Sequence, residues 1–101
     1  MFRRRFRDVI ARQLDMFERE HAELIEECED ALRAHRDASR EDAEELYGDY
    51  LDLVETGAEA LAELRDTYAA TLDEDTAEEY VAAFNRGAGR RLPRFAPLIG
   101  D

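Results

Sequence analysis

The residues best suited to binding a metal are Glu18 and His21, which form an E-x-x-H pair in a proline-free stretch of the chain. In a helix, this spacing puts the carboxylate and the imidazole on one face. Di-iron proteins of the four-helix type combine two such pairs with two further glutamates from neighbouring helices. A dimer of this chain would supply two pairs, so one hypothesis is a metal-binding protein that holds iron, manganese or zinc.

Such an assembly resembles the small encapsulated ferritins, which are built from two-helix chains. The resemblance is one of size and shape, and it implies a ferroxidase-like or storage activity. The other glutamates argue against it, because Glu55, Glu59 and Glu63 fall on the outward side of their predicted helix and Gly57 is expected to face His21. Without an inward carboxylate the ligand set is incomplete. We therefore predict no metal and no cofactor, and keep the ferritin-like site as an alternative.

His21, Cys28 and His35 follow one another at intervals of seven residues and share one side of the predicted helix. Seven residues span about 10.5 Å along a helix, so one metal cannot join two of these positions in the same chain. Cys28, the only cysteine, lies in mid-helix, where a thiol packs as a small apolar group. We predict no catalytic residue and a non-enzymatic protein.

Basic side chains gather near the two ends of the chain. Residues 1–12 hold five arginines and one aspartate, residues 86–94 hold four arginines, and residues 13–85 between them hold 24 acidic residues and five arginines. The first group could bind an anionic membrane or a nucleic acid, or it could neutralise the acidic cluster at residues 73–75. The candidate contact residues are Arg3, Arg4, Arg5 and Arg7.

The last segment, residues 93–101, contains two prolines and three large apolar side chains, Phe95, Leu98 and Ile99. Proline spacing predicts an extended tail. Such a tail could dock into a groove of a partner protein, or fold back and pack on its own chain. The sequence leaves both alternatives open.

These residues must be positioned by helices, because residues 1–92 contain no proline and little glycine. Apolar residues recur in steps of three and four along two stretches, which predicts helices over about 3–36 and 40–72. Ser39 is a good N-cap for the second of them. A shorter helix is predicted over about 76–90, followed by the tail.

Two helices of similar length joined by a short turn are expected to fold back antiparallel. A turn between Ala38 and Ser39 predicts four facing pairs along the hairpin: Ile10 with Tyr68, Phe17 with Leu61, Leu24 with Val54, and Cys28 with Tyr50. We predict an all-α fold with a single helical domain over residues 1–92, in which this long hairpin and the shorter helix complete a helical bundle as a homodimer.

The composition narrows the function further. With 26 acidic residues, 14 arginines and no lysine, the net charge of −12 opposes general binding of nucleic acid. A single cysteine and the lack of a long apolar run favour a soluble, cytoplasmic protein without a transmembrane segment. We predict a structural or protein-interaction module of unknown partner. The alternatives are the ferritin-like metal protein and binding of an anionic surface through the N-terminal arginines.

Overall fold

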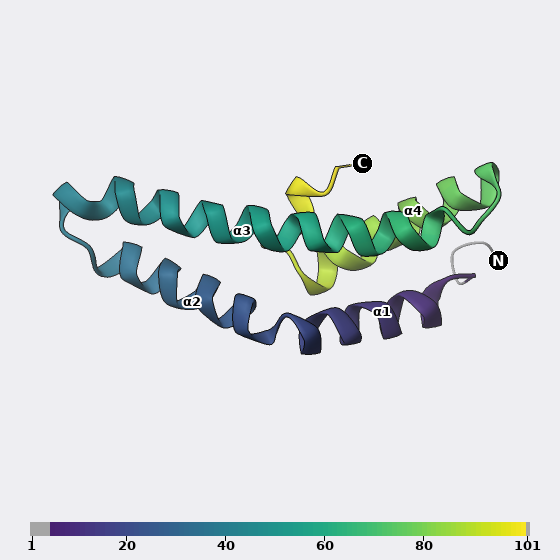
Figure 1. Cartoon of the computed structure of the whole chain (residues 1–101), viewed down its shortest axis with the longest axis horizontal. Coiled ribbons are helices and arrows are strands. Elements are labelled where there is room, and N and C mark those ends of the chain that lie inside the picture. Colours follow the sequence, from purple (N-terminus) through teal and green to yellow (C-terminus); the bar gives the residue numbers. More distant parts are fainter. Residues whose placement is uncertain (1–4, 101) are drawn as a thin grey trace.

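The computed structural model describes residues 5–100 and is helical, as the sequence predicts (Figure 1). The helices are α1 (Arg7–Glu20), α2 (Ala22–Asp37), α3 (Arg40–Ala69) and α4 (Glu74–Arg91), and a short 3₁₀ helix, η2 (Ala96–Leu98), follows them. No strand occurs among the described residues. The molecule is elongated, with extents of 51 × 22 × 20 Å.

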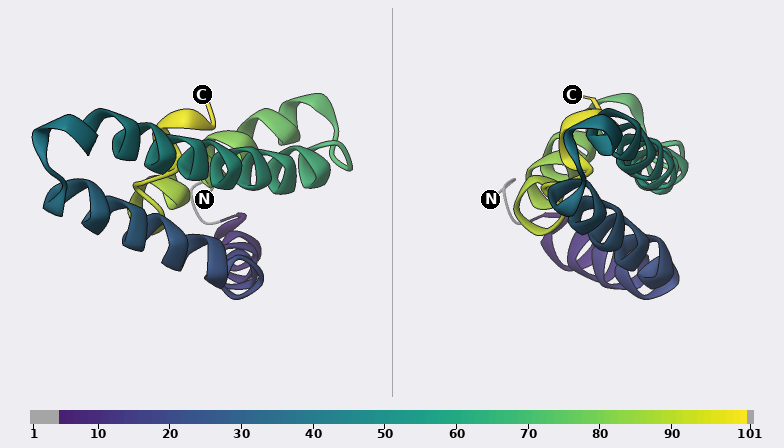
Figure 2. Two further views of the ribbon diagram at one scale, coloured as in Figure 1. Left: turned by 60° about the vertical axis from the view of Figure 1, so that its left-hand side comes forward. Right: turned by 90° about the vertical axis from the view of Figure 1, so that its left-hand side faces the viewer.

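The first predicted helix, over residues 3–36, is divided at His21, so the prediction of one continuous helix is wrong. The backbone of His21 has φ −113° and ψ 26°, outside the helical region, and separates α1 from α2. Figure 2 shows the resulting bend, with α1 seen nearly along its axis in the view where α2 runs across. No proline or glycine marks this position, so the local sequence carries no signal for the bend.

The bend coincides with an aromatic ring placed between α1 and α3. The ring of Phe95 lies 6.1 Å from that of Phe17 between centroids and occupies the space beside Gly57. A Cβ atom on Gly57 would lie 2.4 Å from Cε1 of Phe95. Gly57 therefore makes room for Phe95, whereas the sequence analysis expected it to face His21. At this level the C-terminal segment packs between α1 and α3.

The turn between α2 and α3 lies where the sequence predicts it. Ser39 is the N-cap of α3, but its hydroxyl donates to the Asp42 carboxylate at 3.3 Å and makes no hydrogen bond to the helix backbone. His35 Nδ1 donates to the carbonyl of Ala43 at 3.0 Å, which ties the end of α2 to the first turn of α3. From this turn, α2 and α3 run side by side in opposite directions (Figure 1).

At the other end of the molecule, the contacts between helices differ from the predicted pairing of the first helix with the second, because α4 packs against both α1 and α3. Ile10 was expected to face Tyr68 of α3, but it lies over Gly87 of α4, where an added Cβ would be 3.1 Å from Ile10 Cγ2. An apolar stripe defines which face of a helix is covered, but not which helix covers it. The sequence therefore could not place α4 within the hairpin.

Most of the core lies where α1, α4 and the second half of α3 meet. Tyr80 is its centre, fully buried, with ring centroids at 5.4 Å from Phe6 and 4.8 Å from Tyr68. Its hydroxyl donates to Oε1 of Gln13 at 2.8 Å. Burial raises the pKa of the Tyr80 phenol to about 12, so the neutral donor persists at physiological pH. In α2, by contrast, only Cys28 is buried.

Helix α4 begins earlier and ends later than predicted. Asp73 is its N-cap and accepts a hydrogen bond from the backbone N–H of Thr76 at 2.9 Å, so the helix begins ahead of its predicted start near residue 76. Gly87 and Gly89 do not interrupt the helix, which continues to Arg91. Gly87 is buried beneath Ile10, where its small size permits close helix contact.

The C-terminal segment folds back, and the prediction of an extended tail is wrong. Phe95 and Ile99 are buried in their own chain, while Leu98 is 51% exposed. Arg65, itself buried, donates to the carbonyl of Ile99 at 2.8 Å and to Oδ1 of Asn85 at 2.9 Å. In this conformation Phe95 and Ile99 serve internal packing, which is the second of the two alternatives that the sequence left open.

Candidate functional site

The carboxylate of the E-x-x-H pair is engaged by an arginine. Arg91 of α4 donates to Oε1 of Glu18 at 2.5 Å and to Oδ1 of Asp15 at 2.7 Å. His21 stacks on Phe17, with ring centroids 4.5 Å apart. Within residues 5–100, no group of three or more His, Cys, Asp or Glu side chains is arranged to hold a metal ion. Glu18 thus joins α1 to α4, and the geometry gives the ferritin-like site no support.

The other two members of the seven-residue series also have partners within the fold. His35 bonds to Ala43 and stacks against Tyr47 at 5.0 Å between ring centroids. Cys28 is fully buried, and this burial raises the pKa of its thiol despite the opposing effect of Arg94. A protonated, inaccessible thiol is a poor nucleophile. Neither residue is placed for catalysis.

The four candidate contact residues near the N-terminus are Arg3, Arg4, Arg5 and Arg7. Arg3 and Arg4 lie outside the described residues. Arg5 pairs with Glu79 of α4 at 3.7 Å and lies over the ring of Phe6, so it contributes to neutralising the acidic end of the molecule. Arg7 differs, because it lines a groove formed with α4.

This groove, which we call the arginine groove, brings together the two basic ends of the sequence. Its volume is about 470 Å³, and it runs between α1 and α4. Four of its lining residues are cationic: Arg7, Arg86, Arg90 and Arg91. The remaining lining residues are small or apolar: Ile10, Ala11, Leu14, Ala83 and Gly87. The groove therefore combines a cationic rim with an apolar floor, in a chain of net charge −12.

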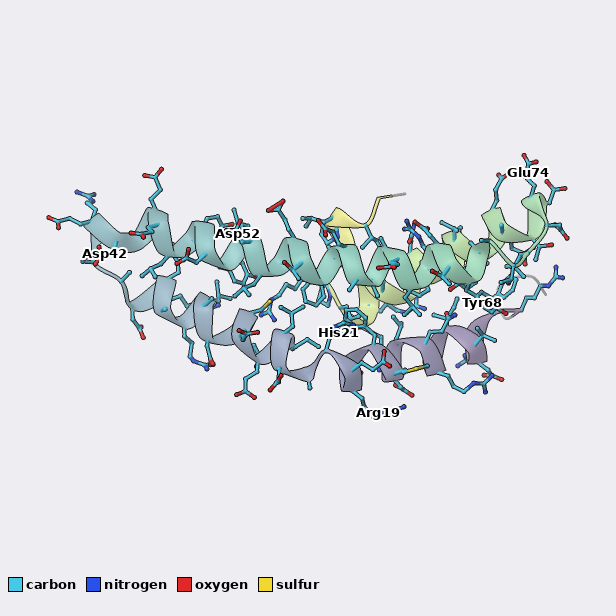
Figure 3. The ribbon with its side chains drawn as sticks, viewed as in Figure 1. Arg19, His21, Asp42, Asp52, Tyr68 and Glu74 are labelled. Atoms are coloured by element: carbon cyan, nitrogen blue, oxygen red, sulfur yellow. The ribbon has the colours of Figure 1, made fainter. Side chains whose placement is uncertain are left out.

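A second groove lies between α1 and α3, and we call it the neutral groove. It has a volume of about 540 Å³. Figure 3 shows His21 and Tyr68 directed into the space between these helices, whereas Arg19 projects from the opposite side of α1. The lining residues are Gln13, Met16, Phe17, Glu20, His21, Ala60, Glu63, Leu64, Thr67, Tyr68 and Thr71. Only two of these eleven carry a formal charge, although 40% of the whole chain is charged.

Sequence reasoning identified both basic segments but not the groove that they form. Arg86 and Arg90 are one helical turn apart, so a signal for a shared basic face was present. Its meeting with Arg7 depends on α4 packing beside α1, which helix periodicity does not specify. The neutral groove was missed for the same reason, because the predicted hairpin would have closed it.

Comparison with known proteins provides no relative: the chain matches no protein-family model, no curated protein sequence and no solved structure. Within residues 5–100, no helix has both the length and the apolar character needed to cross a membrane. The two grooves are therefore the features of this chain that bear on its function.

Proposed function

We propose that this chain is a non-enzymatic helical interaction module, and that its neutral groove binds a second copy of the same chain. The observation that carries the proposal is the low charge of this one face. The centres of protein interfaces are depleted of charged residues relative to the remaining surface. A face with two carboxylates, Glu20 and Glu63, among eleven lining residues fits that description, and it contrasts with the acidic surface of the helices around it.

A second copy is the favoured occupant because the face carries both a groove and an apolar projection. Met16 lines the groove and is 43% exposed. In a two-fold dimer, each partner would place its Met16 against the other's groove, since the same surface serves both chains. Flexible methionine side chains fill irregular apolar gaps well. Covering this face would also complete the helical bundle that the sequence predicts.

The size of the molecule is compatible with such an interface. Stable interfaces bury about 800 Å² on each partner. One long face of the protein measures about 51 by 22 Å, so most of that face would be covered. Both helices that flank the groove, α1 and α3, would then contribute to a four-helix interface.

Light scattering coupled to size exclusion tests the proposal. The wild-type chain is expected to elute as a dimer. Met16→Glu places a charge on the proposed interface and is expected to give a monomer, because an unpaired buried carboxylate is costly. Leu51→Glu is the matched control, since Leu51 is 41% exposed on α3 and does not line the groove. Circular dichroism would establish that both variants fold.

A wild-type monomer at high micromolar concentration would contradict the proposal, as would equal dimerisation of the Met16→Glu variant. The cytoplasmic location expected from the composition stays a prediction, and fractionation of the producing cells would test it. The metal-binding alternative has no supporting observation in the geometry of Glu18 and His21, which are engaged by Arg91 and Phe17.

A further inference from the structure

The arginine groove holds an uncompensated positive charge. Arg91 is bound by two carboxylates, but Arg7, Arg86 and Arg90 form no ion pair with the carboxylates of residues 5–100. Like charges around one groove repel each other, and a bound anion would relieve that repulsion.

The walls of the groove are fixed by the same contacts that neutralise Arg91. Its guanidinium group joins α4 to Asp15 and Glu18 of α1, and these hydrogen bonds raise the pKa of Arg91. Arg86 and Arg90 lie one turn apart on α4 and therefore project from the same face. The three unpaired arginines thus line one groove between two helices that are joined across it.

We propose that the arginine groove binds a compact phosphate monoester that carries an apolar group. A guanidinium group can donate two parallel hydrogen bonds to two oxygens of one phosphate group. This bidentate geometry favours phosphate over an anion such as chloride, which has a single acceptor atom. Ile10 and Leu14 line the floor and provide an apolar surface for the substituent. The volume of about 470 Å³ lies within the range of small-ligand sites, roughly 300 to 1,000 Å³.

Acidic residues beside the groove favour a compact ligand over an extended anionic surface. Asp15 and Glu18 lie at the end formed by Arg91, and Glu79 lies further towards the start of α4. Electrostatic screening acts over about 8 Å at physiological ionic strength. A membrane or a nucleic acid covering the groove would therefore approach these carboxylates and the acidic body of the chain. A small phosphate ester would contact only the groove.

This site is independent of the proposed dimer. The arginine groove uses Arg7, Ile10 and Leu14 of α1, whereas the neutral groove uses Gln13, Met16 and Phe17. The two grooves share no lining residue, and the second wall is α4 in the arginine groove and α3 in the neutral groove. A chain that fails to dimerise could still bind the phosphate ester, and the reverse also holds.

Isothermal titration calorimetry with phenyl phosphate as the probe tests the site. The double variant Arg86→Gln with Arg90→Gln is expected to weaken binding at least about tenfold, through loss of two charge-assisted contacts. The control variant, Arg36→Gln with Arg40→Gln, removes the same charge from exposed positions outside the groove and is expected to bind as the wild type does. Inorganic phosphate is expected to bind more weakly than phenyl phosphate, because it has no apolar group to contact Ile10 and Leu14.

Several results would overturn the proposal. One is the absence of heat change with phenyl phosphate up to about 10 mM, which corresponds to binding weaker than about 3 kcal/mol. Another is an equal loss of affinity for phenyl phosphate in the two double variants. That result would mean that the anion is attracted by the overall charge of the chain and not by the groove. A third is co-sedimentation of the protein with phosphatidylserine vesicles, if phenyl phosphate does not reverse it and the Arg86 and Arg90 substitutions abolish it. That result would mean that the groove binds a lipid surface. Matching urea midpoints would show that the variants remain folded.

Discussion

Gly57 and Phe95 show how one residue without a side chain determines the path of a distant segment. Phe95 is 1% exposed, and its ring fills the position that a side chain on residue 57 would occupy. The same ring contacts Phe17 of α1. Gly57 therefore permits the C-terminal segment to pack between two helices. Gly48, in the same helix, has no atom within 4 Å of its would-be Cβ, and so provides a natural comparison.

We expect Gly57→Ala to destabilise the fold by about 1 to 3 kcal/mol, since the new methyl group would overlap the buried ring of Phe95 and force it to shift. Gly48→Ala adds the same methyl group to the same helix without a clash. It is expected to stabilise the chain by about 0.5 to 1 kcal/mol through helix propensity. Urea denaturation followed by circular dichroism measures both. Equal effects of the two substitutions would show that Phe95 does not occupy this position in solution.

Among the helices, the features that could be predicted from the sequence are those that depend on the local pattern of residues. The helical class, the turn at Ala38 and Ser39, and the existence of a shorter helix after the hairpin all follow from periodicity and capping. The break at His21 does not, because it coincides with a contact between segments far apart in the chain, that of Phe17 with Phe95. The same reason explains why Arg7 and Arg86 were recognised as basic but not as neighbours.

Helix capping provides a test at this scale, because α3 and α4 begin with caps of different kinds. Asp73 accepts from the backbone of Thr76, and this hydrogen bond lowers the pKa of its carboxyl group. Ser39 makes no such bond. Asp73→Ala is therefore expected to lower the melting temperature by a few degrees, and Ser39→Ala by less.

The contribution of Asp73 is also expected to depend on pH. Because its pKa is lower in the folded chain than its ordinary value of 3.8, its stabilisation is present above pH 3.8 and is lost as the pH falls through the folded value. The difference in melting temperature between the wild type and Asp73→Ala should therefore narrow in acid. Calorimetry at neutral pH and near pH 2 measures this. A constant difference across that range would contradict the cap seen in the structure.

At the scale of the whole molecule, stability is divided unequally along its length. The end formed by α1, α4 and the second half of α3 holds nearly all of the buried side chains. The other end consists of α2 and the first half of α3, where exposed Tyr47 and Leu51 contrast with a single buried Cys28 in α2. Both grooves lie at the well-packed end. The binding surfaces are thus supported by the part of the fold that has a core.

This division predicts different local stability within one continuous helix. In α3, all the buried residues lie from Val54 onwards. Amides of residues 44–52 are expected to exchange with solvent hydrogen at least about tenfold faster than those of residues 56–66, because local opening of the first half exposes little apolar surface. Hydrogen exchange followed by mass spectrometry of fragments compares the two halves at equal pH and temperature. Uniform protection along α3 would mean that another surface covers Tyr47 and Leu51 in solution. The second copy would then have to contact α3 at this end rather than at the neutral groove.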